Sequence, residues 1–347
     1  MKKVVLGMSG GVDSAVAALL LKEKGYEVIG ITFKMLENFD TKKAIDTANF
    51  LNIEHHVIDL CEEFKKEIID KFNSDYQNGL TPNPCVLCNK NIKFKYLEDA
   101  RVKYNADYIA TGHYAKIENN HIYKSDDLNK DQSYFLSSID KILIDKLIFP
   151  LESITKEEVR DIASKYNLPS SSSKDSFDVC FIANQTFREY IEKINPSIPG
   201  DIINVVTNEV IGTHEGLFKY TIGQRKNVGL SGNEERHYVC GKDIINNKLY
   251  VAFGDSSYLY STSCILKDTN ILVEDIKENL TAQVKYHGEN YPCKITRVDN
   301  NLKVDFINPA KCVTPGQTCV IYSDNLCIGS GTIFKVLKDD KELWYLK

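Results

Sequence analysis

The sequence predicts an α/β domain that is followed by a β-rich tail, and three observations lead to this prediction. Up to about residue 196, short apolar runs alternate with helical patterns. A glycine-rich turn joins the first strand pattern to the first helix pattern. Beyond residue 197 the helical patterns give way to short strand patterns separated by Gly, Asn and Asp. Because strands and helices alternate in the first part, we expect a parallel sheet with helices on both faces.

The elements of the first part are recognised by their periodicity. We expect strands over residues 4–8, 27–33, 55–60 and 107–111, and helices over residues 15–21, 41–51, 61–76, 92–104, 132–139 and 156–166. In the third of these helices Phe64, Ile68 and Phe72 recur every fourth residue and form one apolar face. The last helix follows Thr155-x-x-Glu158, which is a capping box.

The tail begins after Pro199-Gly200 and carries short apolar runs. We expect strands near residues 205–206, 210–212, 248–251 and 282–286. Asn246-Asn247 and Asp299-Asn300-Asn301 are typical of hairpin turns. The expected division is a catalytic domain over 1–196, a small β-rich linking domain over 197–262 and a β-barrel over 263–347.

Composition limits the class of protein. The chain has 347 residues, 43% hydrophobic and 26% charged, with a formal net charge of −5, as in ordinary globular proteins. The N-terminus does not resemble a signal peptide, and no apolar run reaches the ~20 residues of a membrane helix. We therefore expect a cytoplasmic protein without a membrane partner. Its ten cysteines are then expected to be reduced.

The glycine-rich turn has the sequence Ser-Gly-Gly-Val-Asp-Ser and starts at residue 9. A glycine turn between a strand and a helix N-terminus presents free N–H groups to an anion. Gly10 and Gly11 admit a phosphate close to the backbone, Ser9 and Ser14 add hydroxyl donors, and Asp13 is a candidate metal ligand or helix cap. The Lys-Ser/Thr of the Walker loop is absent. The turn resembles the loop of ATP pyrophosphatases that activate an oxygen by adenylation, and a simple tight turn is the alternative.

Cysteine placement is the second strong signal. Residues 81–89 read as a proline-stiffened loop that presents Cys85 and Cys88, and Cys180 follows about ninety residues later. Four arrangements are compatible with such a trio: a zinc site lacking a fourth ligand, a redox pair, a three-cysteine iron–sulfur cluster with one open iron, and a persulfide attacked by a second thiol. The remaining cysteines are expected to be buried, inert thiols: Cys61, Cys240, Cys264, Cys293, Cys312, Cys319 and Cys327.

Several motifs in a fixed order make the chain resemble a known family. They are Ser-Gly-Gly-Val-Asp-Ser, Thr-Pro-Asn-Pro-Cys-x-x-Cys-Asn, Ala110-Thr111-Gly112-His113-Tyr114, Lys130-Asp131-Gln132-Ser133-Tyr134, Tyr220-Thr221-Ile222-Gly223-Gln224-Arg225-Lys226 and Pro315-Gly316-Gln317. This ordered set resembles the tRNA-specific 2-thiouridylase (MnmA) family of the PP-loop ATP pyrophosphatase superfamily, over essentially the whole chain. The resemblance implies an adenine nucleotide alpha-hydrolase (HUP-like) domain, a linking domain and a tRNA-contacting barrel.

The resemblance also implies a reaction and its residues. ATP with Mg²⁺ adenylates the C2 oxygen of the wobble uridine in a tRNA anticodon arm, and sulfur then replaces AMP to give 2-thiouridine. The implied catalytic pair is Cys88 and a persulfide on Cys180. The positions implied for ATP are Gly7, Met8, Ser9, Gly10, Gly11, Val12, Asp13, Ser14, Phe33 and Gly112. The positions implied for the target base and tRNA are Asn83, Pro84, Cys85, His113, Lys130, Asp131, Gln132, Lys285, Tyr286 and Gln317.

Position 85 departs from the family pattern, because it is commonly aspartate and here is cysteine. Related thiouridylases with a similar cysteine trio use a 4Fe–4S cluster, so Cys85, Cys88 and Cys180 are also candidate cluster ligands. The sulfur donor would be a cysteine desulfurase or relay protein in the persulfide route, or sulfide in the cluster route. Two rival functions are a small-molecule adenylating synthetase or amidotransferase, and a non-catalytic tRNA-binding metalloprotein. The intact glycine loop argues against a non-catalytic tRNA-binding protein, which would have no use for ATP.

Overall fold

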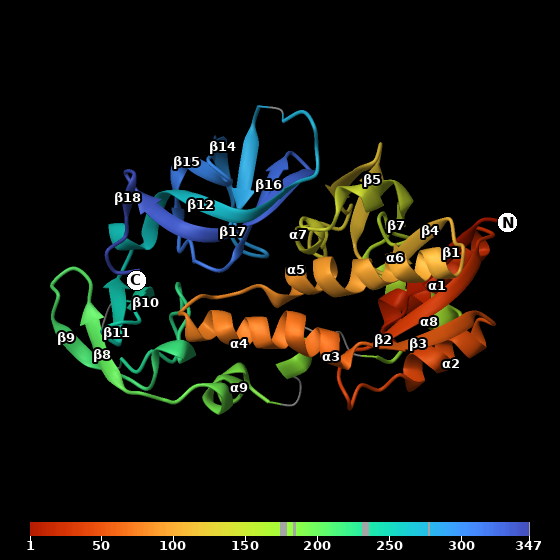
Figure 1. Ribbon diagram of the computed structural model, residues 1–347, viewed down its shortest axis with the longest axis horizontal. Helices are drawn as coiled ribbons and strands as arrows, with labels where there is room; N and C mark the ends of the chain where they lie inside the picture. The colour runs from red at the N-terminus through yellow and green to blue at the C-terminus, as the bar shows by residue number, and fades with distance from the viewer. Residues whose placement is uncertain (174–178, 183–184, 231–235, 277, 347) are drawn as a thin grey trace.

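The computed structural model describes residues 1–173, 179–182, 185–230, 236–276 and 278–346. Its N-terminal part contains a five-stranded sheet in which all neighbouring strands are parallel (Figure 1). The strands in spatial order are β3 (Glu54–Asp59), β2 (Glu27–Lys34), β1 (Lys3–Gly7), β4 (Tyr108–Thr111) and β7 (Leu147–Ile148). The predicted parallel sheet is confirmed.

Helices cover both faces because successive side chains of a strand point to opposite sides. On β1, Val4 and Leu6 join one hydrophobic cluster and Val5 joins another. The first face is covered by α1 (Val12–Glu23), α2 (Lys42–Phe50) and α8 (Lys156–Lys165), and α8 has the predicted Thr155–Glu158 capping box. The second face carries two long helices.

Both long helices contain a π-helical segment. The first, expected as one helix over 61–76, consists of α3 (Cys61–Phe64), η1 (Lys65–Ile69) and α4 (Asp70–Gln77). The second consists of α5 (Pro84–Cys88), η2 (Asn89–Lys93) and α6 (Phe94–Lys103). The sequence analysis expected this helix to begin at residue 92 and the cysteines to lie in a loop, and this expectation is wrong. Asn83 Oδ1 accepts a hydrogen bond from Val86 N (3.3 Å), and proline is tolerated in a first helical turn, so the helix begins at Pro84.

A hairpin of the N-terminal part belongs to the barrel sheet, which the sequence did not predict. β5 (Ala115–Glu118) and β6 (His121–Lys124) form it, and β6 pairs with the barrel through Tyr123 and Leu326. The helix expected over 132–139 shortens to α7 (Ser133–Leu136). The remaining short elements are α9 (Phe187–Ile194) and the 3-10 helices η3 (Lys141–Lys146), η4 (Cys180–Ile182), η5 (Leu217–Lys219) and η6 (Ser257–Leu259).

The tail forms two sheets. The central one has the order β10 (His237–Asp243), β11 (Lys248–Phe253), β8 (Gly200–Asn204) and β9 (Val210–His214). The barrel is antiparallel and closes through pairing of its first and last strands: β12 (Tyr260–Ile271), β15 (Asn301–Lys311), β14 (Asn290–Val298), β13 (Leu280–Gln283), β16 (Thr318–Ser323) and β17 (Leu326–Lys338), with β18 (Lys341–Glu342) beside β17. Both predicted hairpin turns are confirmed, with positive φ at Asn247 and Asp299.

Two of the expected tail strands were misplaced. Residues 205–206 follow β8 rather than forming a strand, and β13 ends at Gln283, before Lys285 and Tyr286. The barrel shares a hydrophobic cluster with the N-terminal part, since Val320 and Tyr322 belong to the same cluster as residues of α5 and α6. None of the described helices combines the length and apolar character needed to cross a membrane.

Candidate nucleotide and sulfur-transfer site

The glycine loop joins β1 to α1 at the carboxyl edge of the parallel sheet. Gly10 has φ +80°, and a Cβ there would lie 3.2 Å from Ala44 N, so α2 packs directly on the loop. Ser14 Oγ donates a hydrogen bond to Gly11 O (3.0 Å) and accepts one from Ser9 N (3.2 Å). These bonds hold the loop in a curve before α1. The first N–H groups of α1 have no partner in a preceding turn and can bind a phosphate.

Asp13 does not cap α1, contrary to one of the two expectations for it, because α1 has no side-chain cap. Its Oδ1 accepts hydrogen bonds from Lys156 Nζ (2.6 Å) and Tyr114 Oη (2.7 Å). Lys156 begins α8 and was missed by the sequence analysis, since nothing in its own segment links it to the loop. A Mg²⁺ ion accompanying ATP would therefore have only Oδ2 of this carboxylate left to bind.

The structure gives two of the positions implied for ATP, Gly112 and Phe33, a packing role as well. A Cβ on Gly112 would lie 2.9 Å from both Asp13 C and Ser14 N. The glycine is therefore needed because β4 ends against the start of α1. The ring of Phe33 is buried in the core beside Tyr96 (ring centroids 6.4 Å apart), so its main chain at the end of β2 is the part that can face a nucleotide.

The three cysteines singled out in the sequence form one electrostatic cluster. Cys85 and Cys88 stand one turn apart on α5, and Cys180 opens η4. Burial, with smaller contributions from the nearby Cys180 and Cys85, raises the pKa of Cys88 to about 12. Burial also raises the pKa of Cys85. The pKa of Cys180 is raised by burial and by the nearby Cys85. Cys88 is buried, whereas Cys85 and Cys180 keep exposed surface. The free protein therefore holds these sulfurs as protonated thiols at neutral pH.

An aromatic cluster places Cys180 next to the helix of the other two. The following residue, Phe181, packs on Phe64 (ring centroids 6.1 Å), Phe72 (5.1 Å) and Tyr190 (5.7 Å). These rings come from α3, α4 and α9. η4 is thus anchored by apolar contacts, which explains how a residue distant in sequence reaches α5.

The cluster was also tested as a metal site. Among the described residues, which include Cys85, Cys88 and Cys180, no three His, Cys, Asp or Glu side chains are grouped so that they could hold a metal ion. As placed here, the three cysteines do not form a site for a single metal ion, and an iron–sulfur cluster held by them stays a prediction.

The positions implied for tRNA are largely engaged in internal contacts. The buried Asp131 carboxylate accepts hydrogen bonds from Ser125 N (3.0 Å) and Ser133 Oγ (2.7 Å), and burial raises its pKa. Gln132 Oε1 accepts one from Tyr114 N (3.1 Å). His113 bonds Thr111 Oγ1 through Nδ1 (2.7 Å), and burial lowers its pKa to about 3, so its ring is neutral. Lys285 is exposed and Lys130 is half-buried.

Positions implied for tRNA that are far apart in the sequence come together at the seam, which is where the barrel packs against the N-terminal part. Tyr286 Oη donates to Asp131 O (3.1 Å), and its ring packs on Phe135 (4.3 Å). Gln317 Nε2 donates to Thr81 O (3.1 Å), two residues before Asn83. The structure therefore joins the segment that leads into α5 with the barrel.

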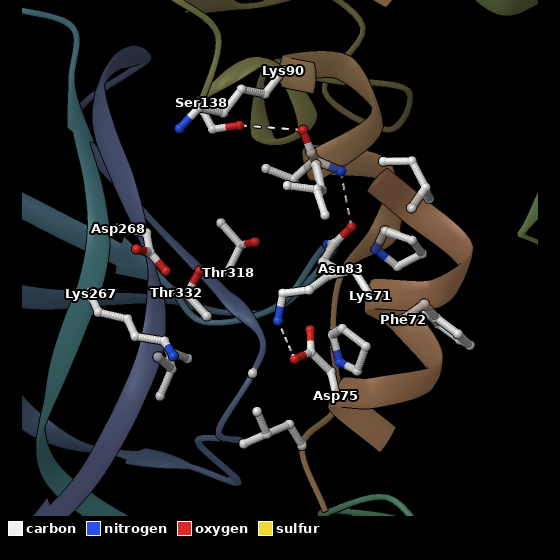
Figure 2. A pocket seen from close by; sticks show the side chains of 18 of the residues that line it. Lys71, Phe72, Asp75, Asn83, Lys90, Ser138, Lys267, Asp268, Thr318 and Thr332 are labelled. Carbon is white, nitrogen blue, oxygen red and sulfur yellow. Dashed lines mark hydrogen bonds and ion pairs between the residues drawn. The ribbon is translucent and has the colours of Figure 1, made fainter. Parts of the chain in front are cut away.

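A cavity of about 280 Å³ lies at the same seam, between α4, α5 and the barrel strands. Figure 2 shows Asn83 and Lys90 on one side and Lys267 and Thr332 on the other, with Lys71 paired to Asp75. Val86 and Leu87 line it, but neither cysteine of α5 does. The cavity thus lies beside the thiol cluster and not at it.

Comparison with known proteins identifies the family. Three family models match in order: tRNA methyl transferase HUP domain (residues 2–184), tRNA methyl transferase PRC-barrel domain (188–253) and Aminomethyltransferase beta-barrel domain (261–333). A tRNA-specific 2-thiouridylase MnmA of Mycoplasmopsis synoviae (strain 53) is 39% identical, with 99% of each chain covered. That of Mycoplasma capricolum subsp. capricolum is 40% identical over 97% of this chain and 100% of the relative. The chain belongs to the tRNA-specific 2-thiouridylase family.

The resemblance inferred from the motifs is confirmed by these matches. The three family models follow the expected order of HUP domain, central domain and barrel, while the boundaries at residues 196 and 262 stay predictions. Among solved structures, a 4-thiouridine synthetase–RNA complex with bound ATP shares 21% identity over 56% of this chain and 51% of that chain, with a TM-score of 0.37. That likeness is too low to bear on function.

Proposed function

We propose that the protein is an ATP-dependent tRNA uridine 2-sulfurtransferase of the cytoplasm that makes 2-thiouridine at the wobble position. The observation that carries this proposal is the combination of a phosphate-binding glycine loop and a cluster of three thiols within one α/β domain. A binding module would need neither, and a small-molecule synthetase would not need the thiols. The full-length family match supports the same reading.

In the first step, the C2 oxygen of the uridine attacks the α-phosphorus of ATP and pyrophosphate leaves. The N–H groups at the start of α1 and the hydroxyls of Ser9 and Ser14 are suited to hold the phosphates. Adenylation turns the C2 oxygen into a good leaving group as AMP. The base must be unstacked for this reaction, and an anticodon loop offers such bases at low cost.

In the second step, the terminal sulfur of a Cys180 persulfide attacks C2, and AMP departs with the C2–O bond electrons. The Cys88 thiolate then attacks Cys180 Sγ, which forms a Cys88–Cys180 disulfide and leaves the transferred sulfur on C2. In this disulfide the two cysteines are oxidised by two electrons relative to their thiols. An external dithiol must therefore reduce it before the next turnover. The persulfide sulfur comes from a cysteine desulfurase or a relay protein. No step of this route runs through iron.

The test is mass spectrometry of nucleosides from tRNA of cells that lack the gene. We expect wobble 2-thiouridine to disappear and the wild-type gene to restore it. Cys180→Ser and Cys88→Ser should not restore it, whereas Cys85→Ser should retain activity because the persulfide route needs only the other two thiols. Unchanged 2-thiouridine in a deletion strain with no second such enzyme contradicts the proposal. A Cys85→Ser variant as inactive as Cys180→Ser contradicts the persulfide route.

A further inference from the structure

Lys93 lies within electrostatic reach of the three thiols, and the π-helical segment between α5 and α6 turns it toward them. In a regular α-helix, with 3.6 residues per turn, a residue five positions on is rotated by about 140° around the axis. Cys88 and Lys93 would then point to different sides. The segment Asn89–Lys93 is π-helical, and Phe94 N–H bonds Asn89 O. A π turn joins residues i and i+5, which brings Lys93 back toward the side of Cys88.

The charge of Lys93 reaches every titratable group of the cluster. It acts to lower the pKa of Cys85, Cys88 and Cys180, and it further lowers that of His113. Lys93 is the one charged side chain in the described part of the chain that lowers the pKa of Cys85 and Cys88. No described carboxylate forms an ion pair with Lys93. The π-helical segment thus places a cation that has no carboxylate partner among the described residues near the buried Cys88 and the more exposed Cys85 and Cys180.

Such a cation is needed by the chemistry. Thiol–disulfide exchange proceeds through anionic sulfur, and burial makes that form costly. His113 cannot supply the charge, because its ring is neutral. We propose that Lys93 is the counterion of the sulfur cluster and stabilises the Cys88 thiolate and the anionic terminal sulfur on Cys180. It acts through these sulfurs and is therefore a positioning residue, and its part in turnover rests on the proposed function.

The test is the rate of alkylation of each cysteine by iodoacetamide between pH 7 and 10, followed by mass spectrometry of peptides from the free protein. Lys93→Met removes the charge at similar size, and Lys93→Arg keeps it. We expect Lys93→Met to slow alkylation of Cys180 and Cys88 about tenfold at pH 8 and to shift both profiles to higher pH. Lys93→Arg should stay within about twofold of the wild type, as an electrostatic role requires.

Two controls accompany the test. Lys103→Met removes an exposed lysine at the end of α6 and should leave every profile unchanged. Cys61, which lies near Lys34 and Asp59, should react equally in all variants. Circular dichroism checks the fold, and Lys93→Gln replaces Lys93→Met as the uncharged variant if methionine unfolds the helix.

The outcomes separate this inference from the proposed function, because alkylation needs neither ATP nor tRNA. Identical profiles for the wild type and the uncharged variant overturn the inference. Lys93→Arg reacting as slowly as Lys93→Met also overturns it, since that result indicates a packing role. A shifted profile in a protein that makes no 2-thiouridine would support the inference and contradict the proposed function alone.

Discussion

Gln317 of the barrel donates a hydrogen bond from Nε2 to the main-chain oxygen of Thr81, over 3.1 Å. Thr81 N in turn donates to Pro315 O (3.0 Å). The turn of residues 315–317 is therefore bonded to both polar groups of one peptide segment, and that segment leads directly to Asn83 and the start of α5. The position of the cysteine helix thus depends on the barrel as well as on its own domain.

Gly316→Ala should disrupt this contact. Gly316 has φ +90°, and a Cβ there would lie 2.8 Å from Thr81 N. Gly25→Ala is a matched control, because Gly25 has φ +82° with nothing within 4 Å. We expect the control to lose about 1–2 kcal/mol from backbone strain alone and Gly316→Ala to lose clearly more. Equal losses in urea denaturation would show that the close approach to Thr81 is unimportant.

Lys156→Met should weaken the glycine loop by removing the cation on Asp13. Lys156 Nζ lies 2.6 Å from Asp13 Oδ1, and both side chains are at least partly buried. A hydrogen bond to a charged group contributes about 1.5–3 kcal/mol, so we expect a stability loss of this order and a higher KM for ATP. Lys156→Arg keeps the charge, so it should keep most of the stability and a KM for ATP near that of the wild type. Unchanged KM and stability in Lys156→Met would contradict this role.

The parallel sheet and its loop could be predicted because they depend on local pattern: apolar strands, a glycine turn and the Thr155–Glu158 capping box. The start of α5 was missed, since Pro84 was taken as a loop residue although Asn83 precedes it as a cap. The Asp13–Lys156 pair and the packing of Phe181 on Phe72 join segments distant in sequence. No periodicity in one sequence encodes such contacts.

Asn83→Ala should destabilise the cysteine helix. Asn83 Oδ1 accepts the hydrogen bond from Val86 N that caps α5, and loss of an N-cap costs about 1 kcal/mol. Asn83→Asp is the matched control, because aspartate caps helices equally well and its charge suits a helix N-terminus. Thermal and urea denaturation should therefore place Asn83→Asp near the wild type and Asn83→Ala below it. Asn83→Asp falling as far as Asn83→Ala would mean that the cap is not what Asn83 contributes.

His113 should make stability depend on pH in mildly acidic solution. Burial lowers its pKa to about 3, against about 6.5 in the unfolded chain, so between these values the unfolded state binds the extra proton. The contribution of His113 is then complete above about pH 6.5 and is lost as the pH falls, by at most about 1.4 kcal/mol per pH unit. From pH 7.5 to 5, the free energy of unfolding should fall by about 2 kcal/mol more in the wild type than in His113→Asn, as measured by urea denaturation. Because the carboxylates titrate in both proteins, the difference isolates the histidine. Parallel pH curves for the two proteins would show that His113 is protonated normally in the folded state.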